Sequence, residues 1–344
     1  MTTTLSPAPS LLEQAQAMTL QPFASWPAQG RPDGYFALEQ AAAAADFYRE
    51  NGFVVLDQAM SRAEVDALNR ETAHLCRNET GGISGIASAA PGESDLDVMK
   101  RVLCIHFPHK LSAVMEKTLH HPATVDLLTR VVSPNVKCMQ SMLFVKASGK
   151  PGQAWHQDED FIPTRDRSLI GAWIALDDAT VVNGCLWVLP KSHRPGILWP
   201  QQKHENRSFD CTQESHQFPW RDEDSVPVEV KAGSIVFFNG YLLHRSLPNR
   251  AKDGFRRSLV NHFMSAESLL PWMLPANFTG GIATADFRDI VMVAGQDPYA
   301  YKGTCDIAKP SVRASGEGGC ESWGKKDPKD AAGTAMMPKV SAMQ

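Results

Sequence analysis

The order of the predicted elements indicates a mainly β (α+β) fold, an antiparallel sandwich or jelly roll with helices on its outside. Helical patterns occupy the first third of the 344-residue chain, and short strand patterns follow from about residue 136. Strand and helix patterns do not alternate along the chain, as they would in a parallel sheet. We expect one domain over 36–310, with an N-terminal arm at 1–35 and a flexible tail at 311–344, where Gly, Ser, Ala and Lys dominate.

The N-terminal part of the domain predicts helices with recognisable ends. LEQAAAAADFYREN ends at Asn51-Gly52, a helix C-cap signal, and a short strand pattern follows directly. Ser61 and Glu64 form a capping box at the start of SRAEVDALNRETAHLCR. HPATVDLLTRVVS predicts a further helix around 121–133. These helices precede the strands and are therefore expected to cover one side of them.

Five strand patterns follow, separated by clusters of Gly, Pro, Asn and Asp. Their short length and the turn signals between them are typical of antiparallel sheets packed face to face. The patterns are VKCMQSMLFVKA, SLIGAWIALDDA, CLWVLPKS, VPVEVKAGSIVFFNG and RRSLVNHFMSA.

Composition excludes several classes of protein. The chain has 34 Lys and Arg against 38 Asp and Glu, a net charge of −4, so no overall basic field favours nucleic acid or an anionic membrane as a partner. No stretch approaches the roughly 18 apolar residues of a membrane span, and the N-terminus lacks the pattern of a secretory signal. The seven cysteines include no CxxC pair, which argues against a zinc ribbon or disulfide framework and favours a reducing, cytoplasmic location.

AWHQDED (154–160) is the most informative stretch. On an extended strand, His156 and Asp158 point to the same face, where an imidazole and a carboxylate can meet one ion. His244, in GSIVFFNGYLLHRSLPNR, is the best candidate for a third ligand, because it follows another strand pattern. Two histidines and one carboxylate form the facial triad of non-haem Fe(II) oxygenases. Zinc hydrolases use similar ligands, although HExxH is absent, and a loop histidine beside solvated carboxylates is the alternative interpretation.

Four motifs in the same order resemble the phytanoyl-CoA dioxygenase-like family of Fe(II)/2-oxoglutarate oxygenases, over roughly residues 40–270. FYRENGFVVLDQAMSRAEVDAL is similar to the opening helix, strand and helix of that family. QSMLFVKASGKPGQAWHQD resembles its first metal-bearing stretch, and NGCLWVLPKSHRPG its characteristic turn and strand. KAGSIVFFNGYLLHRSLPNR followed by GFRRSL resembles its distal-histidine segment and the arginine after it.

The resemblance implies a double-stranded β-helix (a cupin-like jelly roll) with flanking helices. It also implies that His156, Asp158 and His244 bind Fe(II), and that Arg256 pairs with the distal carboxylate of the cosubstrate 2-oxoglutarate. Arg257 remains an alternative, because the stretch after His244 is about one residue longer than expected. Ser258 shares the strand face of Arg256 and can offer a second hydrogen bond to the same carboxylate. Further cosubstrate contacts are implied more weakly for Met142 and Trp173, with core packing as the alternative, and for Lys100, with surface exposure as the alternative.

The implied activity is hydroxylation, or another oxidation, of a C–H bond in a small-molecule metabolite with O2, releasing succinate and CO2. The same iron site serves desaturation, ring formation and epimerisation, so the outcome and the substrate stay open, as does the oligomeric state. Loops at 79–97 and 200–225 and the segment after 270 are expected to line the substrate pocket. Two alternatives are a non-oxidative, cupin-type metal-dependent hydrolase or isomerase and an inactive jelly-roll binding protein.

Overall fold

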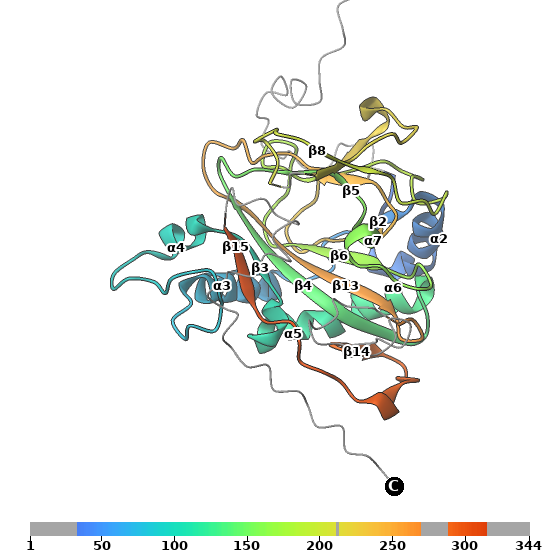
Figure 1. The fold of residues 1–344 in the computed structure, drawn as a ribbon, viewed down its shortest axis with the longest axis horizontal. Coiled ribbons are helices and arrows are strands. Elements are labelled where there is room, and N and C mark those ends of the chain that lie inside the picture. Colours follow the sequence, from blue (N-terminus) through green and yellow to red (C-terminus); the bar gives the residue numbers. More distant parts are fainter. Residues whose placement is uncertain (1–32, 211–212, 270–287, 315–344) are drawn as a thin grey trace, which may run out of the picture.

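Two β-sheets face each other, and helices cover the outer side of the larger one (Figure 1). The structure is a computed structural model that describes residues 33–210, 213–269 and 288–314. The larger sheet has nine strands, eight of them in one continuous order and β14 paired with β4. In that order they are β1 (Tyr35–Phe36), β2 (Phe53–Leu56), β11 (Ile235–Asn239), β6 (Ile170–Ala175), β13 (Phe255–Ser265), β4 (Val136–Ala147), β3 (Val102–His106) and β15 (Ser311–Ala314), with β14 at Val291–Ala294.

The smaller sheet has four strands, and a two-stranded ribbon lies beside it. All pairs in the two sheets are antiparallel except β1 with β2. This arrangement confirms the predicted mainly β jelly roll. In spatial order the smaller sheet contains β10 (Val226–Val228), β7 (Leu186–Val188), β12 (His244–Ser246) and β5 (Gln153–His156), and the ribbon contains β8 (Gln201–Lys203) and β9 (Gln213–Ser215).

The helices of the N-terminal part form the outer layer that the sequence predicted. They are α2 (Ala41–Asn51), α3 (Arg62–Arg77), α4 (Asp95–Arg101), α5 (Ala113–Lys117) and α6 (Pro122–Val131). The Asn51-Gly52 signal is confirmed, because Gly52 caps α2 in the left-handed conformation (φ 82°). Ser61 and Glu64 form the expected capping box of α3.

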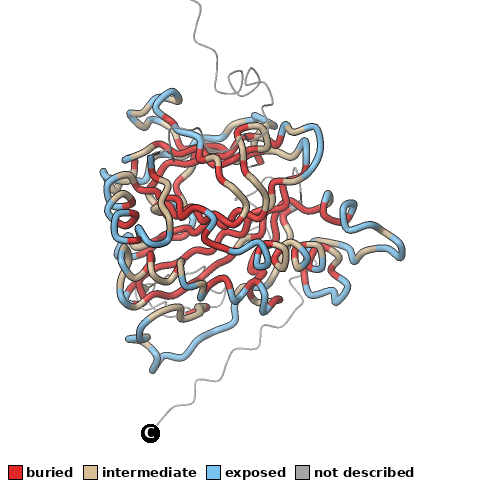
Figure 2. The backbone as a smooth tube through the Cα atoms, turned by 180° about the vertical axis from the view of Figure 1, so that it is seen from behind, coloured by how far each residue is buried: buried red, intermediate tan, exposed pale blue. Residues whose placement is uncertain are grey.

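Strand alternation gives the larger sheet two different faces. Leu143 and Val145 of β4 point to the outer core that packs under the helices, whereas Phe144 points to the inner core between the two sheets. β13 behaves in the same way, with Leu259 outside and Val260 inside. The interior between the sheets is therefore bordered on both sides by buried strands, as the burial view shows (Figure 2). Side chains on these inner faces are the ones that can form a buried site.

The predicted flexible tail at 311–344 is wrong for its first four residues. Ser311–Ala314 form β15, which pairs with β3 at the edge of the larger sheet. Val312 packs against the outer core, and Arg313, 6% exposed, forms an ion pair with Asp210. This packing outweighs the polar composition of the segment. Residues 315–344 and residues 1–32 of the predicted arm lie outside the described residues.

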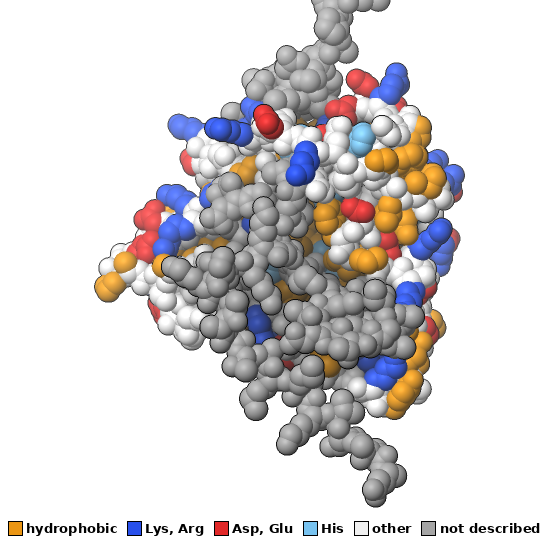
Figure 3. Space-filling view, in the orientation of Figure 1, with side chains coloured by type: hydrophobic (Ala, Val, Ile, Leu, Met, Phe, Trp, Pro, Cys, Tyr) orange, Lys and Arg blue, Asp and Glu red, His pale blue; other side chains and the backbone are white. Residues whose placement is uncertain are grey.

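No helix among the described residues is long and apolar enough to cross a membrane. On the face seen in the space-filling view, basic and acidic side chains are interspersed (Figure 3). Five of the seven cysteines lie in the described residues, and all five are free thiols.

Candidate metal centre

His156 and His244 lie directly opposite each other on neighbouring strands of the smaller sheet. β5 ends at His156, β12 begins at His244, and the antiparallel register pairs the two residues. Their ring centroids are 4.1 Å apart. The structure therefore brings together the two histidines that the sequence singled out, although 87 positions separate them in the chain.

Asp158 completes the group, but not from the strand position that the sequence predicted. It is the first residue of a short helix, α7 (Asp158–Phe161), which begins two residues after the end of β5. Gln157 still has extended backbone angles (φ −126°, ψ 127°), so the side chains of Asp158 and His156 project to the same side of the chain. The amide of Gln157 is fully buried and bonds to the backbone of Ile197, Trp199 and Tyr241, which fixes this short segment.

The three side chains present their ligand atoms to one point. Asp158 Oδ1 lies 3.6 Å from His156 Nε2 and 3.5 Å from His244 Nε2, and the three ligand atoms are all within 4.8 Å of one another. His156 Nδ1 lies 2.8 Å from the carbonyl oxygen of Ala154, and His244 Nδ1 lies 2.9 Å from that of Leu242. A carbonyl oxygen only accepts, so each Nδ1 carries the proton and each Nε2 keeps a lone pair for a metal. The donor set fits one Fe(II) ion with open positions.

The electrostatics of the group also suit a cation. Burial, together with the neighbouring His244, lowers the pKa of His156 to about 4, so the ring is neutral near pH 7. Burial alone would raise the pKa of Asp158, but the surrounding imidazoles of His244, His262 and His156 outweigh it and hold the pKa well below its usual range. Two imidazoles and one carboxylate thus face each other in a site whose side chains are 4–13% exposed.

His262 is a site residue that the sequence analysis missed. It lies on β13 in the larger sheet, is 4% exposed, and places Nε2 3.1 Å from Asp158 Oδ2. Asp158 therefore directs Oδ1 to the two histidines while His262 holds Oδ2. The only signal in the sequence was its spacing: His262 lies an even number of residues from Arg256 and Ser258, which places all three on one face of the strand.

Glu159, the next acidic residue, points away from this group. Its carboxylate accepts hydrogen bonds from the backbone N–H and hydroxyl of Thr164, both at 2.5 Å. Its backbone N–H donates to Gly240, so it ties α7 to the loop between β11 and β12. Glu159 therefore supports the shape of the segment and is not one of the clustered ligands.

Arg256 lies on the inner face of β13 and is 3% exposed. Its Nη1 donates to Ser258 Oγ at 2.7 Å, and its guanidinium lies 5.4 Å from the ring centre of Trp173. Burial lowers its pKa to about 10, so the group stays charged at neutral pH. Its Nε has no hydrogen-bond partner and no ion pair involves it among the described residues. A buried guanidinium with a free donor is suited to a carboxylate of a ligand.

The neighbouring Arg257 is engaged elsewhere. Its Nε and Nη2 donate to the two carboxylate oxygens of Asp177 at 2.9 and 2.6 Å, and its backbone N–H donates to the same side chain. Strand alternation places it on the opposite face from Arg256. Of the two arginines left open by the sequence, the geometry favours Arg256.

The remaining predicted residues divide into two groups. Trp173 is buried under Arg256, and Met142 lies half-buried on the inner face of β4, opposite Val260. Lys100, by contrast, is on the exposed side of α4, where its ammonium pairs with Asp97 at 3.2 Å and its side chain is 59% exposed. The structure does not bring Lys100 to the buried group, because the lysine points outward in the last turn of its helix.

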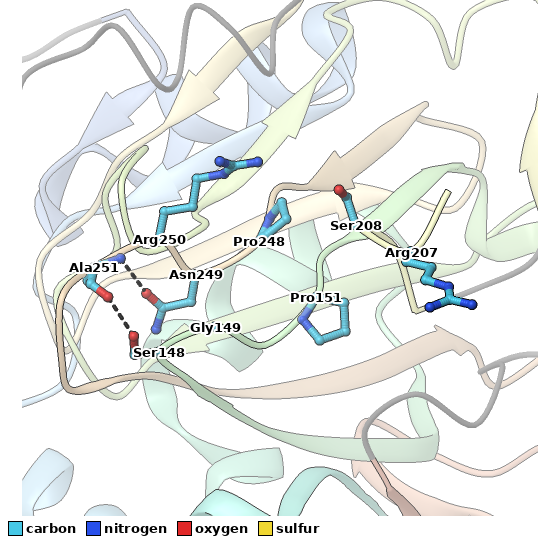
Figure 4. Close-up of a pocket in the computed structure, with 9 residues that line it drawn as sticks. All are labelled: Ser148, Gly149, Pro151, Arg207, Ser208, Pro248, Asn249, Arg250 and Ala251. Atoms are coloured by element: carbon cyan, nitrogen blue, oxygen red, sulfur yellow. Dashed lines mark hydrogen bonds between the residues drawn. The ribbon is translucent and has the colours of Figure 1, made fainter. Parts of the chain in front are cut away.

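A separate surface cavity of about 490 Å³ lies at the loop that joins β4 to β5 (Figure 4). Arg207 and Arg250 border it, and its lining includes Asn249, whose side chain accepts a hydrogen bond from the backbone of Ala251. None of the three clustered metal ligands lines it. This cavity is distinct from the candidate metal centre.

Comparison with known proteins agrees with this geometry. The family model described as "Phytanoyl-CoA dioxygenase (PhyH)" matches residues 48–258, which is more than half of the chain. The chain belongs to the phytanoyl-CoA dioxygenase family. Membership of this family makes it an Fe(II)- and 2-oxoglutarate-dependent dioxygenase, and the His156, Asp158 and His244 group is of the type that such enzymes use.

Relatives in the phytanoyl-CoA dioxygenase family match at moderate identity. The phytanoyl-CoA dioxygenase of Arabidopsis thaliana is 28% identical over 235 residues, which cover 59% of this chain and 82% of the relative. The peroxisomal phytanoyl-CoA dioxygenase of Homo sapiens is 30% identical over 238 residues, which cover 64% of this chain and 67% of the relative.

Solved structures confirm the fold. The non-haem alpha-ketoglutarate-dependent carbocyclase SnoK from nogalamycin biosynthesis superposes with a TM-score of 0.53 at 21% identity, over 77% of this chain and 100% of that chain. At this identity the likeness concerns the architecture of the two sheets. It supports the cupin-like jelly roll expected from the sequence.

Proposed function

We propose that this chain oxidises a C–H bond of a small-molecule metabolite, most simply by hydroxylation, with His156, Asp158 and His244 as the ligands of Fe(II). The observation that carries the proposal is the convergence of two Nε2 lone pairs and one carboxylate oxygen within 4.8 Å. Fe(II) prefers this two-histidine, one-carboxylate set when open positions are needed for a cosubstrate and O2.

We further propose that Arg256 binds the distal carboxylate of 2-oxoglutarate, with Ser258 fixing the guanidinium and Trp173 and Met142 forming apolar walls. The support is the buried charge of Arg256, its free Nε and its contact with Trp173. A charge-assisted bond to a carboxylate would satisfy the buried donor. Lys100 is not part of this proposal.

When bound, the iron and 2-oxoglutarate supply the oxidising chemistry, in which 2-oxoglutarate and O2 are converted to succinate, CO2 and an oxidant for the substrate. The protein holds the ligand geometry, through the backbone bonds of both histidines and the contact of His262 with Asp158. It also limits water, since the ligand side chains are at most 13% exposed between the two sheets. A small molecule fits such an enclosed site better than a macromolecule.

The acyl-CoA in the family's name belongs to the named relatives, and the cytoplasmic location expected from the cysteines stays a prediction. Residues 270–287, part of the expected pocket lining, lie outside the described residues.

Succinate release tests the proposal. Purified protein is incubated in air with Fe(II), 2-oxoglutarate and members of a metabolite library, and succinate and oxidised product are measured together. We expect a substrate to stimulate succinate formation with matched product, and His156→Ala to form neither. Succinate formation that is equal in His156→Ala and the unchanged protein would overturn the ligand assignment. Product formation without 2-oxoglutarate or O2 would favour the hydrolase or isomerase alternative.

A further inference from the structure

A buried lysine lies beside Arg256 in the interior between the sheets. Lys146 is on β4, directly opposite Arg256 of β13 in the antiparallel register, and its side chain is 2% exposed. Side chains directly opposite each other on neighbouring strands have Cβ atoms about 5 Å apart. Two basic side chains thus occupy adjacent positions on one buried face. Like charges in that arrangement are unfavourable unless an anion lies near them.

The hydrogen bonds of Lys146 connect the larger sheet to the strand that carries His244. Its Nζ donates to Ser246 Oγ at 3.0 Å and to the carbonyl oxygen of Leu247 at 2.9 Å. Both partners are neutral, so neither balances the charge of an ammonium. An ammonium has three N–H groups, and these two bonds leave one donor for a ligand.

Ser246, which accepts one of these bonds, lies at a distance from His244 that suits the length of the cosubstrate. Ser246 is two residues beyond His244 on the same strand, so the two side chains share a face about 7 Å apart. A five-carbon dicarboxylate whose keto-acid end is held near His244 can place its other carboxylate beside Ser246. Lys146 reaches Ser246 from β4, and Arg256 lies directly opposite Lys146 on β13.

The backbone packs closely against Lys146 at Gly184. A Cβ atom on Gly184 would lie 3.1 Å from Nζ and 2.3 Å from the backbone oxygen of Leu247, so the chain leaves only a hydrogen there. Burial, followed by the neighbouring Arg256, lowers the pKa of Lys146 well below its usual range, while Cys185 and Asp210 act in the opposite direction. An added carboxylate between the two basic groups would stabilise the charged lysine.

We propose that Lys146 is a second basic contact, beside Arg256, for the distal carboxylate of 2-oxoglutarate. The inference rests on the proposed function, because it assumes that 2-oxoglutarate occupies this interior. It gives Lys146 the role that the sequence resemblance had implied for Lys100. It also links cosubstrate binding to β12, since the same ammonium bonds Ser246 and Leu247.

The test compares two ligands that differ only at the distal end. Anaerobic protein with Fe(II) is titrated with 2-oxoglutarate and with 2-oxopentanoate, which keeps the keto acid and lacks the second carboxylate. The visible charge-transfer band and the ligand-induced rise in melting temperature each give the affinity. Lys146→Met, close in size and uncharged, is the main variant. Arg257→Met, on the opposite strand face, is the matched control for loss of a basic residue.

We expect Lys146→Met to weaken 2-oxoglutarate binding by roughly tenfold or more, the loss typical of one hydrogen bond to a charged group, and to leave 2-oxopentanoate binding within about twofold. Arg257→Met should change neither affinity. An equal loss of affinity for both ligands would overturn the proposal, because it would show that Lys146 only supports β12. No loss of affinity for either ligand would overturn it as well. If Lys146→Met does not fold, Lys146→Gln, whose uncharged amide can still donate to Ser246 or Leu247, must weaken 2-oxoglutarate binding and leave 2-oxopentanoate binding unchanged.

Failure of the proposed function gives a different result. If the unchanged protein shows no band and no melting shift with either keto acid, 2-oxoglutarate is not its cosubstrate, and the proposed function fails together with this inference. If the unchanged protein binds both ligands but the Lys146 variants show no selective loss, only the inference fails.

Discussion

Loss of His262 is expected to weaken metal binding, although His262 is not itself one of the three clustered ligands. The variant His262→Leu removes the group that lies 3.1 Å from Asp158 Oδ2. Both side chains are largely buried, at 5% and 13% exposure, so water cannot easily replace the lost bond. Without it, the carboxylate keeps an unsatisfied oxygen and can rotate away from the two histidines.

The magnitude follows from the contact that is lost. Partners that orient a metal ligand typically contribute 10- to 100-fold to metal affinity. We therefore expect His262→Leu to raise the Kd for Mn(II), used as an oxygen-stable substitute for Fe(II), by about 10- to 100-fold, or about 1.4 to 2.8 kcal/mol. Isothermal titration calorimetry under identical buffer conditions measures this change directly.

Two further variants separate positioning from general damage. His262→Gln offers an amide donor and should recover part of the lost affinity. His109→Leu removes another buried histidine, one that bonds Ser141 instead of Asp158, and should leave the metal affinity unchanged. The reasoning is refuted if folded His262→Leu binds Mn(II) like the unchanged protein, or if His109→Leu weakens binding to the same extent.

Three other predictions concern the cosubstrate, acid stability and the C-terminal strand. Arg256→Met should weaken 2-oxoglutarate binding by about 10- to 100-fold, the loss of one or two charge-assisted bonds, whereas Arg257→Met should leave that affinity unchanged in an anaerobic titration. His109 is buried in its neutral form. Burial, and then the neighbouring Lys110, lowers its pKa to about 4, so this histidine binds a proton more readily in the unfolded chain than in the folded protein. Stability should therefore fall as pH drops from about 6.5 towards 4, by at most about 3 kcal/mol from this group, and urea unfolding of His109→Gln should show a smaller pH dependence. Arg313→Met leaves the carboxylate of Asp210 buried without this ion pair and should lower the free energy of unfolding by about 3 kcal/mol or more. Adding Asp210→Asn to that variant should restore part of the lost stability. An equal melting temperature for the unchanged protein, the single variant and the double variant would contradict this prediction.

The sequence predicted the parts of the structure that depend on local pattern. The end of α2 at Asn51-Gly52 and the capping box at Ser61 follow from backbone chemistry, which acts within a few residues. The stretch VKCMQSMLFVKA coincides with β4, because its apolar residues on both faces suit a strand buried on two sides. His156 and Asp158 were identified because their short spacing is compatible with one ion.

The parts that escaped prediction depend on contacts between distant elements. A histidine such as His262 in an apolar strand has the same local pattern whether it fills a core or holds a ligand. Lys146 is similar, because a lysine near a strand end usually lies at the surface. The resemblance implied a role for Lys100 but could not show that it points to solvent from α4. β15 was missed because its few residues adjoin a long polar segment and form a strand only through pairing with β3.

An anaerobic spectral titration is the clearest test that His156, Asp158 and His244 hold an iron ion that binds 2-oxoglutarate. Protein without metal is given Fe(II) and then 2-oxoglutarate, and the visible charge-transfer band that arises when the keto acid chelates the iron is recorded. We expect one bound Fe(II) per chain and a saturable band in the unchanged protein. The band should be lost in Asp158→Ala and retained in Glu159→Gln, whose side chain bonds Thr164 instead of facing the histidines. A saturable band of unchanged intensity in Asp158→Ala, or no band in the unchanged protein, would contradict the assignment of the metal centre.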